Sequence, residues 1–380
     1  MDQIFVKDRL ALMLDHFGDV GDPREACKVK YPLAEVLFLV TCASIAGCDD
    51  FDEIADWGQH HQAFLKSYGE YFFGTPKEDW LRVVLNRIDP ALFEACFTTW
   101  AQSLRPDAPD LIALDGKTLR RSGDAGAGLK PIHLVSAWAS TQRLVLALEA
   151  VDAKENECAA ILAILERLTV KGALVTIDAI ATNPVIAKAI TDKGGDYILA
   201  LKRNQPTLHD EVAAYFADPA TTGLASVTAL EKDHGRIETR TTTVSHNIDW
   251  LTGDRRHPGE HRFPGLASLI QATTQVECKG KITHDTRYFI ASARLSPERA
   301  AEAIRNHWGI ESMHWVLDVI FKEDQSRLRR GHGAQNMALV RRLAFNMVRA
   351  GKGKRSIKTA RKAAGWSTEL LQSILRPIPR

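Results

Sequence analysis

The segment from residue 111 to residue 202 constrains the fold most, because short apolar runs alternate there with amphipathic ones. The strand-like runs are LIALD (111–115), IHLVSAWAS (132–140), LVLALEAV (144–151), ALVTIDAI (173–180) and DYILALK (196–202). Helical patterns lie at 156–168 and 184–194, the second with proline at its start and glycine at its end. The order is three strands, helix, strand, helix, strand. It predicts a mixed α/β layer whose helices cover the sheet.

The flanking segments have other periodicities, which divide the chain into five expected regions. Apolar residues at three- and four-residue spacing predict helices throughout residues 1–105. Alternating segments such as ETRTTTVSH and TRYFIASAR predict a β-rich insertion at 203–295. The expected regions are a helical N-terminal domain (1–105), the first part of an α/β core (106–202), the insertion (203–295), core helices (296–350) and a basic helical tail (351–380).

Charge is distributed unevenly along a chain whose net charge is only +2. Residues 1–100 hold 9 basic and 17 acidic side chains, whereas residues 322–380 hold 15 basic and 3 acidic ones. A basic C-terminal region suits a polyanion such as nucleic acid, although a solvated basic helix pair explains the charge equally well. We expect no membrane partner, because the longest apolar runs are too short or carry a charge. The first residues also lack a signal-peptide pattern.

Three carboxylates are candidates for chemistry. Asp115 closes the run LIALD, and Asp178 lies at the exit of the fourth expected strand, where sites form in α/β sheets. Each could instead be a cap or an ion pair, for example with Lys117. The third candidate lies in HWGIESMHWVLDV, which predicts a helix over 307–321 with a core stripe of Ile310, Met313, Leu317 and Ile320. Beside that stripe runs a polar ridge made of His307, Glu311, His314 and Asp318.

A helix packed on the sheet by its apolar stripe would bring Glu311 to Asp115 and Asp178. Three carboxylates around one pocket suit Mg²⁺ or Mn²⁺, which prefer oxygen ligands. Two such ions serve in-line phosphoryl displacement. A zinc site made of His307, Glu311 and His314 is a weaker alternative, because no cysteine lies nearby and the two aspartates would then be idle. Glu323 and Asp324 are alternatives to Glu311 as the third ligand.

Several segments together resemble one known family. They are DPREACKVKYPLAEVLFLVTCASIAGCDDFDEIADW, IALDGKTLRRS, AKENE, VTIDAIATN, DYILALKRNQPTLH, HGRIETR, RNHWGIESMHWVLDVIFKEDQSRLR and SIKTARKAAGWSTELLQSIL. In this order, nearly end to end, they resemble bacterial insertion-sequence transposases of the DDE type, in the branch of the H-repeat-associated proteins. The resemblance implies a ribonuclease H-like core with a mixed sheet flanked by helices, interrupted by the β-rich insertion. It also implies that the protein binds two divalent metal ions, either Mg²⁺ or Mn²⁺, to cut and join transposon ends.

By position, the resemblance makes Asp115, Asp178 and Glu311 the catalytic carboxylates and metal ligands. The 133 residues between Asp178 and Glu311 fit relatives in which a mostly β insertion separates these two carboxylates. The chain departs from the family pattern at several positions, including TIDAIATN in place of the commoner TIDAMGCQ, LKRNQ in place of LKGNQ, and two positions near Glu311. Related transposases have an arginine four residues before the glutamate and a lysine seven residues after it, where this chain has His307 and Asp318.

A second group of residues is expected to contact DNA, because basic and amide side chains near the carboxylates and in the tail suit phosphate binding. Salt bridges or solvated loops are the alternative for each of them. The residues are Lys117, Arg120, Arg121, Lys202, Asn204, Gln205, Arg236, Arg240, His307, Arg327, Lys354, Arg355, Lys358, Arg361 and Lys362.

The function expected from these features is that of a cytoplasmic bacterial DNA transposase associated with the nucleoid. Its partners would be double-stranded DNA, as transposon terminal repeats and as target. A homodimer is expected on DNA, because two ends must be brought together. A stand-alone metal-dependent nuclease and a decayed, inactive DNA-binding relative are the alternatives.

Overall fold

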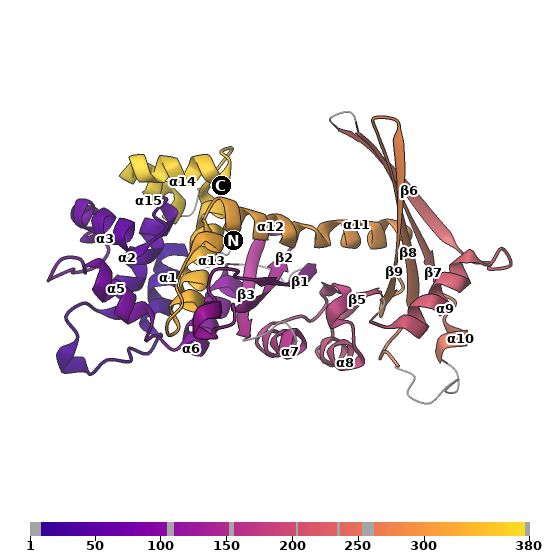
Figure 1. The fold of residues 1–380 in the computed structure, drawn as a ribbon, viewed down its shortest axis with the longest axis horizontal. Coiled ribbons are helices and arrows are strands. Elements are labelled where there is room, and N and C mark those ends of the chain that lie inside the picture. Colours follow the sequence, from indigo (N-terminus) through magenta and orange to yellow (C-terminus); the bar gives the residue numbers. More distant parts are fainter. Residues whose placement is uncertain are drawn as a thin grey trace, which may run out of the picture.

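The computed structural model describes residues 9–104, 110–151, 156–202, 204–233, 236–252 and 262–376. The molecule is elongated (Figure 1). A helical body built from both ends of the sequence lies at one end, a sheet with its helices lies in the middle, and long strands stand at the other end. Two helices, α11 (Pro297–His307) and α12 (Gly309–Val319), run in line from the strands to the helical body.

The central strands follow the order expected from the sequence. They are β1 (Leu111–Thr118), β2 (His133–Ala139), β3 (Leu144–Val151), β4 (Leu174–Ile177) and β5 (Asp196–Leu201), with helices α7 (Glu157–Arg167) and α8 (Pro184–Asp192) between them. The strands are arranged β3-β2-β1-β4-β5. β1, β4 and β5 are parallel, whereas β2 and β3 form antiparallel pairs. Figure 1 shows α7 and α8 side by side beneath these strands.

Residues 203–295 are rich in strands, as expected, and these strands extend the central sheet. They are β6 (Ala225–Asp233), β7 (Arg236–Ser245), β8 (Ser268–Cys278) and β9 (Lys281–Ala291), accompanied by α9 (Pro206–Ala217) and α10 (Asp249–Thr252). We call β6–β9 the wing. β9 pairs with β5 from Ile198↔Ala291 to Leu201↔Tyr288, so one nine-stranded sheet runs from β3 to β6. The segment GDRRHPGEHRFPG (253–265), whose composition predicts a loop between β7 and β8, lies largely outside the described residues.

Helices α11 and α12 are almost one helix. The sequence predicts a helix from residue 307, whereas the structure ends α11 at His307 and starts α12 at Gly309. Trp308 between them keeps helical dihedral angles (φ −62, ψ −10), so the direction of the chain hardly changes. The expected stripe is confirmed for Ile310, Met313 and Leu317, which are buried, and Ile320 packs against the same core while partly buried.

The helical body joins the two ends of the sequence. Its N-terminal helices are α1 (Arg9–Gly18), α2 (Leu33–Ile45), α3 (Phe51–His60), α4 (Gln62–Leu65), α5 (Glu78–Leu85) and α6 (Pro90–Ser103). Its C-terminal helices are α13 (Gly333–Gly351), α14 (Ile357–Trp366) and α15 (Thr368–Leu375). The expected boundary at residues 105–106 lies outside the described residues.

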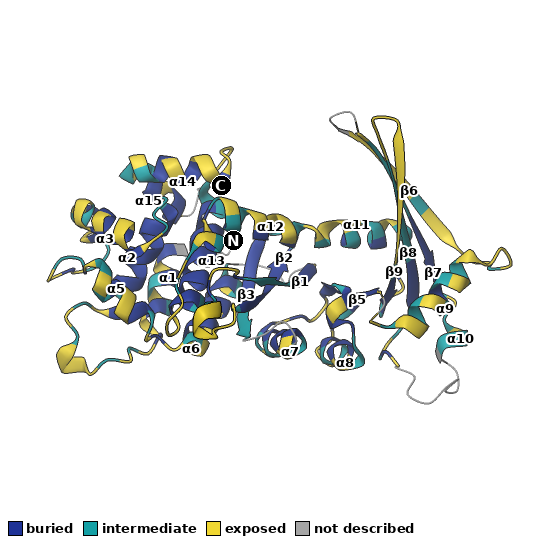
Figure 2. Cartoon of the chain, viewed as in Figure 1, coloured by how far each residue is buried: buried dark blue, intermediate teal, exposed yellow. Residues whose placement is uncertain are grey.

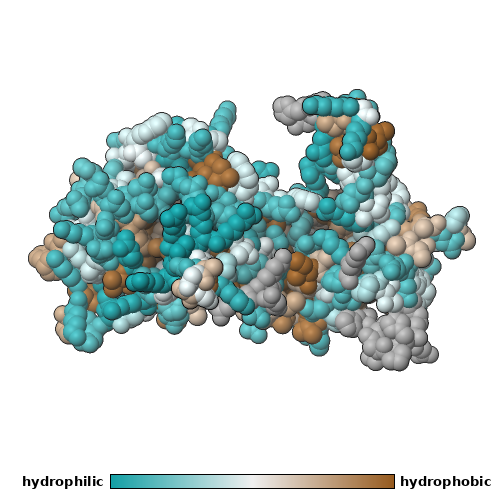
Figure 3. All heavy atoms as spheres, in the orientation of Figure 1, coloured by the Kyte–Doolittle hydropathy of each residue, from teal (hydrophilic) through white to brown (hydrophobic). Residues whose placement is uncertain are grey.

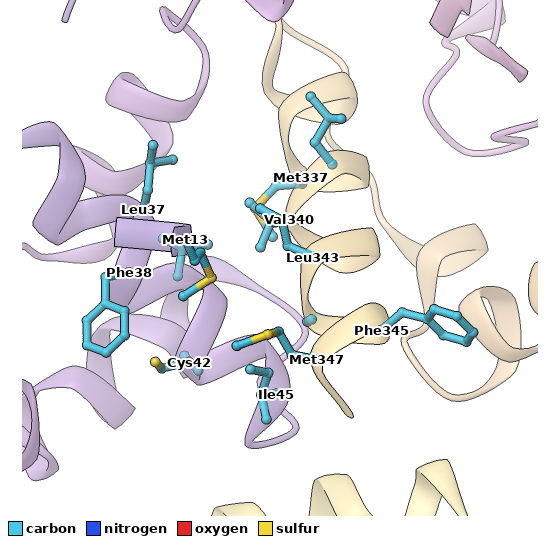
Figure 4. Packing of buried hydrophobic residues seen from close by; sticks show 14 of the residues in the cluster. Met13, Leu37, Phe38, Cys42, Ile45, Met337, Val340, Leu343, Phe345 and Met347 are labelled. Carbon is cyan, nitrogen blue, oxygen red and sulfur yellow. The ribbon is translucent and has the colours of Figure 1, made fainter. Parts of the chain in front are cut away.

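The buried helix α13 fills the centre of this body. Met337, Val340, Leu343 and Met347 belong to one apolar core with residues of α1 and α2 (Figure 4). Both α2 and α13 are dark along most of their length when coloured by burial (Figure 2). On its other side α13 covers the edge of the sheet, where the Asn346 amide accepts from Val145 N and donates to Val145 O. Among the described residues, no helix is long and apolar enough to span a bilayer.

Candidate active site

Two of the expected carboxylates are neighbours because of the register of the parallel strands. The last pair between β1 and β4 is Leu114↔Ile177, so Asp115 and Asp178 follow directly on adjacent strands. One expectation is corrected here. Asp115 does not end its strand, because β1 continues to Thr118 along β2, and Asp115 pairs there with Ser136. Asp178 does follow the end of β4, and β1 outlasts β4 because only β2 extends far enough to pair with it.

Glu311 reaches the same place from α12. The apolar stripe of that helix packs on the sheet, and its N-terminal turn lies over the ends of the strands. Asp115, Asp178 and Glu311 line one pocket of about 190 Å³. The other lining residues are Thr176, Ile177, Ile198, Ala200, Leu201, Lys202, Arg287, Tyr288, Phe289, Ile304, His307 and Trp308. The structure therefore brings the three carboxylates together, over separations of 63 and 133 residues.

The protein environment shifts the pKa values of these carboxyls differently. Burial raises the pKa of Asp115 to about 7, and the carboxylates of Glu157, Asp178 and Glu311 add to the rise, while the Gly116 N–H opposes it. Burial also pushes the pKa of Asp178 upward, but the Ala179 N–H and Lys202 outweigh it, so this pKa lies below its ordinary value. Lys202 Nζ lies 3.0 Å from Asp178 Oδ1. Burial and the charge of Asp178 raise the pKa of Glu311.

The two histidines of the polar ridge are neutral and point to different partners. His307 Nδ1 lies 2.9 Å from Thr176 Oγ1, and burial lowers the pKa of this imidazole to about 4. Burial, Arg342 and Lys117 lower the pKa of His314 to about 3, and its Nδ1 lies 3.5 Å from Asp115 Oδ2. Within the described ranges no group of three or more His, Cys, Asp or Glu side chains is close enough to hold a metal ion, and this applies to His307, Glu311 and His314 as it does to the three carboxylates.

The chemistry of the pocket nevertheless fits a hard divalent cation. Its three carboxylates supply oxygen donors, and among the described residues the only basic side chain that pairs with Asp115 is the neutral His314. The pKa of Asp115 is raised because burial and neighbouring carboxylates disfavour its ionised form, and a bound cation would favour that form. In the geometry described here the three carboxylates face one space without converging on a single point. A cation would be held by the same side chains after small rotations.

Of the residues expected to contact DNA, two lie in the pocket. Lys202 is half exposed beside Asp178, and neutral His307 lies against Thr176. His307 therefore offers a phosphate no fixed positive charge. The amides of Asn204 and Gln205 lie nearby but donate to the backbone carbonyls of Ala179 and Thr182. These two side chains hold the segment that follows Asp178.

Two expected DNA contacts are corrected because their side chains are buried. Lys117 is 8% exposed and forms ion pairs with Asp318 and Glu323. Arg361 is 4% exposed and donates to Ser44 O, Ile320 O and Asp49. Glu323, the alternative third ligand, is wholly buried between Lys117 and Arg342. Asp324, the other alternative, lies 3.9 Å from Arg120, and neither side chain lines the carboxylate pocket.

The remaining expected DNA contacts lie outside the pocket. Arg120 and Arg121 are exposed in the turn after β1. On β7, Arg236 pairs with Glu238 at 2.9 Å, and Arg240 pairs with Glu231 and Glu238, each at 2.8 Å. Exposed Arg327 lines a separate pocket with Asp49, Asp50, Asp52 and Glu53. Lys354, Arg355, Lys358 and Lys362 are exposed at and before α14.

The expected set missed one cation in the pocket. Arg287 of β9 lies over the Trp308 ring, 5.0 Å from its centroid, and also pairs with Asp285 at 2.8 Å. Its segment, TRYFIASAR, shows only the alternation of a strand. Nothing in the sequence tells that β9 pairs with β5, and that pairing alone carries Arg287 to the pocket.

Comparisons with known proteins point in one direction. Residues 14–101 match the family model described as DDE_Tnp_1-associated, and residues 106–347 match the model described as Transposase DDE domain. The chain is 37% identical over 371 residues to "Putative transposase YncI" of Escherichia coli O157:H7, covering 96% of this chain and 94% of that protein. It is 34% identical to "H repeat-associated putative transposase YhhI" of Escherichia coli K12, covering 96% of this chain and 98% of the relative.

A solved structure also aligns with the chain. It is the piggyBac transposase synaptic complex with hairpin DNA, matched with a TM-score of 0.43 at 10% sequence identity, over 98% of this chain and 79% of that one.

Proposed function

The chain belongs to the family of transposases with a DDE domain, and we propose that it cuts DNA at transposon ends and joins those ends to target DNA, with Asp115, Asp178 and Glu311 as its catalytic residues. The observation that supports this most is the meeting of these three carboxylates in one pocket, two of them aligned by strand register. We also propose that β1–β5 with α7, α8, α11 and α12 form a ribonuclease H-like core.

The same carboxylates would hold two divalent metal ions, either Mg²⁺ or Mn²⁺. When bound, the metal stabilises negative charge on the attacking and leaving oxygens of a phosphoryl displacement. The protein contributes orientation: register fixes Asp115 against Asp178, and the packing of α12 fixes Glu311. Lys202 and Arg287 supply positive charge at the pocket for a DNA phosphate.

The proposed reaction has two displacements at phosphorus. Water first attacks a phosphodiester at the end of the element, and the 3′-oxygen leaves as a 3′-hydroxyl. That hydroxyl then attacks a phosphodiester of target DNA and displaces another 3′-oxygen, so the number of phosphodiester bonds is conserved in the joining step. Two ends must take part, so we propose a homodimer on double-stranded DNA.

The test uses single variants of the full chain with DNA that carries the terminal repeat. We expect Asp115→Asn, Asp178→Asn and Glu311→Gln each to lower Mn²⁺-dependent cleavage by at least about 10³-fold, because each removes a metal oxygen donor. Binding of the same DNA should change by less than about threefold. Glu53→Gln, an exposed carboxylate of the helical body, is the control and should cleave normally.

The outcomes separate the candidate activities. Cutting followed by joining supports the transposase, whereas cutting without joining supports a nuclease. Tight binding without either reaction would make the chain an inactive DNA-binding relative. Normal cleavage by Glu311→Gln would remove Glu311 from the catalytic set.

A further inference from the structure

Helix α14 and the turn before it carry positive charge that no carboxylate of the described chain neutralises. Lys354, Arg355, Lys358 and Lys362 are exposed, and none of the four forms an ion pair with a described residue. Other expected DNA contacts differ. Lys117, Lys202, Arg236 and Arg240 each have a carboxylate partner at 3.0 Å or less. Four exposed cations without a described ion pair therefore lie within nine residues of sequence, at and just before α14.

These side chains form an ordered ridge. Lys358, Lys362 and Trp366 follow one another at four-residue spacing, which places them on one side of α14. Trp366 is 78% exposed, unlike most large apolar side chains here. The opposite side of the helix, with Ile357, Ala360 and Ala364, is buried. We call Lys354, Arg355, Lys358, Lys362 and Trp366 the α14 ridge.

The ridge is held rigidly relative to the helix that carries Glu311. Arg361, on the buried side of α14, donates to Ser44 O at the end of α2 and to Ile320 O just past α12. Its guanidinium also lies 4.0 Å from the centroid of the Phe321 ring. At Gly365 a Cβ would lie 2.5 Å from Ala46 O, so the end of α14 touches the backbone after α2. The ridge and the pocket therefore belong to one rigid frame.

We propose that the α14 ridge is a second contact surface for duplex DNA, distinct from the carboxylate pocket. Its lysines bind phosphates, and Trp366 packs its ring against the sugar-phosphate backbone. Cations four residues apart on a helix are spaced by about 6 Å. Along the axis of B-DNA the phosphates of one strand rise by about 3.4 Å each, so every second phosphate is displaced by about 7 Å along that axis. Arg361 is a positioning residue that fixes this surface relative to Glu311.

The proposal rests on DNA being the substrate, and its test keeps the two questions apart. The background is full-length protein with Asp115→Asn, which prevents cleavage. Lys358→Gln with Lys362→Gln is compared with Lys66→Gln with Lys77→Gln, two exposed lysines of the acidic N-terminal region that also lack a described ion pair. Both pairs change the net charge equally. Binding of a 30-base-pair duplex is followed by fluorescence anisotropy from about 50 to 200 mM salt.

We expect the ridge pair to weaken binding at least about tenfold at 150 mM salt and to reduce the slope of log K against log salt by about 2. The control pair should leave both quantities unchanged. Trp366→Ala should weaken binding with an unchanged slope, because it removes a contact without removing a charge. Thermal midpoints within about 2 °C of the background protein establish that each variant is folded.

Equal affinity and slope for the ridge pair and the background protein would overturn the ridge proposal while leaving the catalytic proposal intact. A change of oligomeric state in sedimentation, with unaltered DNA binding, would also overturn it and would point to the acidic N-terminal region of a second copy as the partner. If the Asp115→Asn background itself fails to bind duplex DNA, the proposed function fails together with the ridge.

Discussion

At the scale of single residues, Asp115 and Asp178 are chemically identical side chains whose surroundings shift their pKa values in opposite directions. They are neighbours across β1 and β4, yet the pKa of Asp115 is raised to about 7 and that of Asp178 is lowered. Burial acts on both. Asp178 also has Lys202 at 3.0 Å, whereas Asp115 faces a neutral histidine and other carboxylates. Near neutral pH, Asp115 is therefore the member of the pair that exchanges its proton most readily.

The raised pKa of Asp115 has a measurable consequence for stability. A carboxyl whose folded pKa is raised binds its proton more tightly in the folded state, so stability falls as pH rises from about 4 to about 7. Asn cannot ionise. We expect Asp115→Asn to match the wild-type stability near pH 4 and to exceed it by about 2–4 kcal/mol at pH 8, measured by urea unfolding with a chelator present.

Asp178→Asn is the matched control, because its ionised form stabilises the folded state. This substitution should lower stability at pH 8 and have a smaller effect near pH 3. An Asp115→Asn variant that gains equally at both pH values would contradict the assignment of the gain to ionisation.

The meeting of the three carboxylates in one pocket could be predicted from residue patterns, because Asp115 and Asp178 each close an apolar run and Glu311 lies beside the apolar stripe of a helix. The roles of Lys117 and Arg361 could not. Both are cations in basic segments, and a cation beside DNA has the same local sequence as a cation paired inside the protein. Only the positions of Glu323 and Asp49, far away in the sequence, decide that Lys117 and Arg361 are buried.

At the scale of elements, α12 is fixed by a chain of ion pairs at its C-terminal end. Lys117 of β1 pairs with Asp318 on α12 and with Glu323 just after it, and Arg342 of α13 pairs with Glu323 at 2.7 Å. Glu323 is wholly buried, whereas the Asp318 side chain is 27% exposed. The helix that carries Glu311 is thus tied both to the sheet and to the helical body.

These two carboxylates should differ sharply when neutralised. Glu323→Gln leaves the buried guanidinium of Arg342 without its carboxylate partner and leaves Lys117 with Asp318 alone, so we expect it to lower the free energy of unfolding by about 3–5 kcal/mol. Asp318→Asn leaves Lys117 its pair with Glu323, so its effect should stay near 1 kcal/mol. Urea unfolding of both variants at pH 7 provides the measurement. Equal losses of unfolding free energy in the two variants would show that the burial of Glu323 does not set the strength of these ion pairs.

The strands of the wing illustrate the same limit on sequence prediction at this scale. Alternation in ETRTTTVSH, LASLIQATTQVE and TRYFIASAR identified β7, β8 and β9, but strand pairing is non-local, so their attachment to β5 could not be predicted. β6 was missed because ASVTALEKD has neither strict alternation nor a dense apolar run. The expected helix from residue 307 was displaced by two residues, because Trp308 separates two helices that share one direction.

At the scale of the whole molecule, strands β1–β5 occupy the middle of an elongated body. The helical body lies on one side of these strands and the wing on the other, and the face in Figure 3 is mostly hydrophilic and hollowed between the two, above α11 and α12. The family model that describes the DDE domain ends at residue 347, within α13. That helix also completes the core of the first hundred residues.

A fragment limited to the catalytic region should therefore not fold alone. In residues 106–350 the apolar side of α13, with Met337, Val340, Leu343 and Met347, would lose its partners on α1 and α2. We expect this fragment to aggregate and to elute in the void volume on gel filtration, because large exposed apolar patches drive association. Co-expression with residues 1–104 should recover a soluble complex, and cooperative unfolding of the fragment by itself would contradict the shared core.

The shared core of α2 and α13 also sets a timetable for synthesis. The ribosome completes α2 at residue 45 and starts α13 only at residue 333. At about 5–20 residues per second, the first helices wait roughly 15–60 s for the segment that covers their apolar sides. During that interval their exposed surface is a natural substrate for chaperones. A messenger RNA that ends before codon 333 would encode chains without α13, and these chains cannot complete the core. Truncated copies of the gene would therefore produce protein that is degraded, rather than stable protein that pairs with the intact chain.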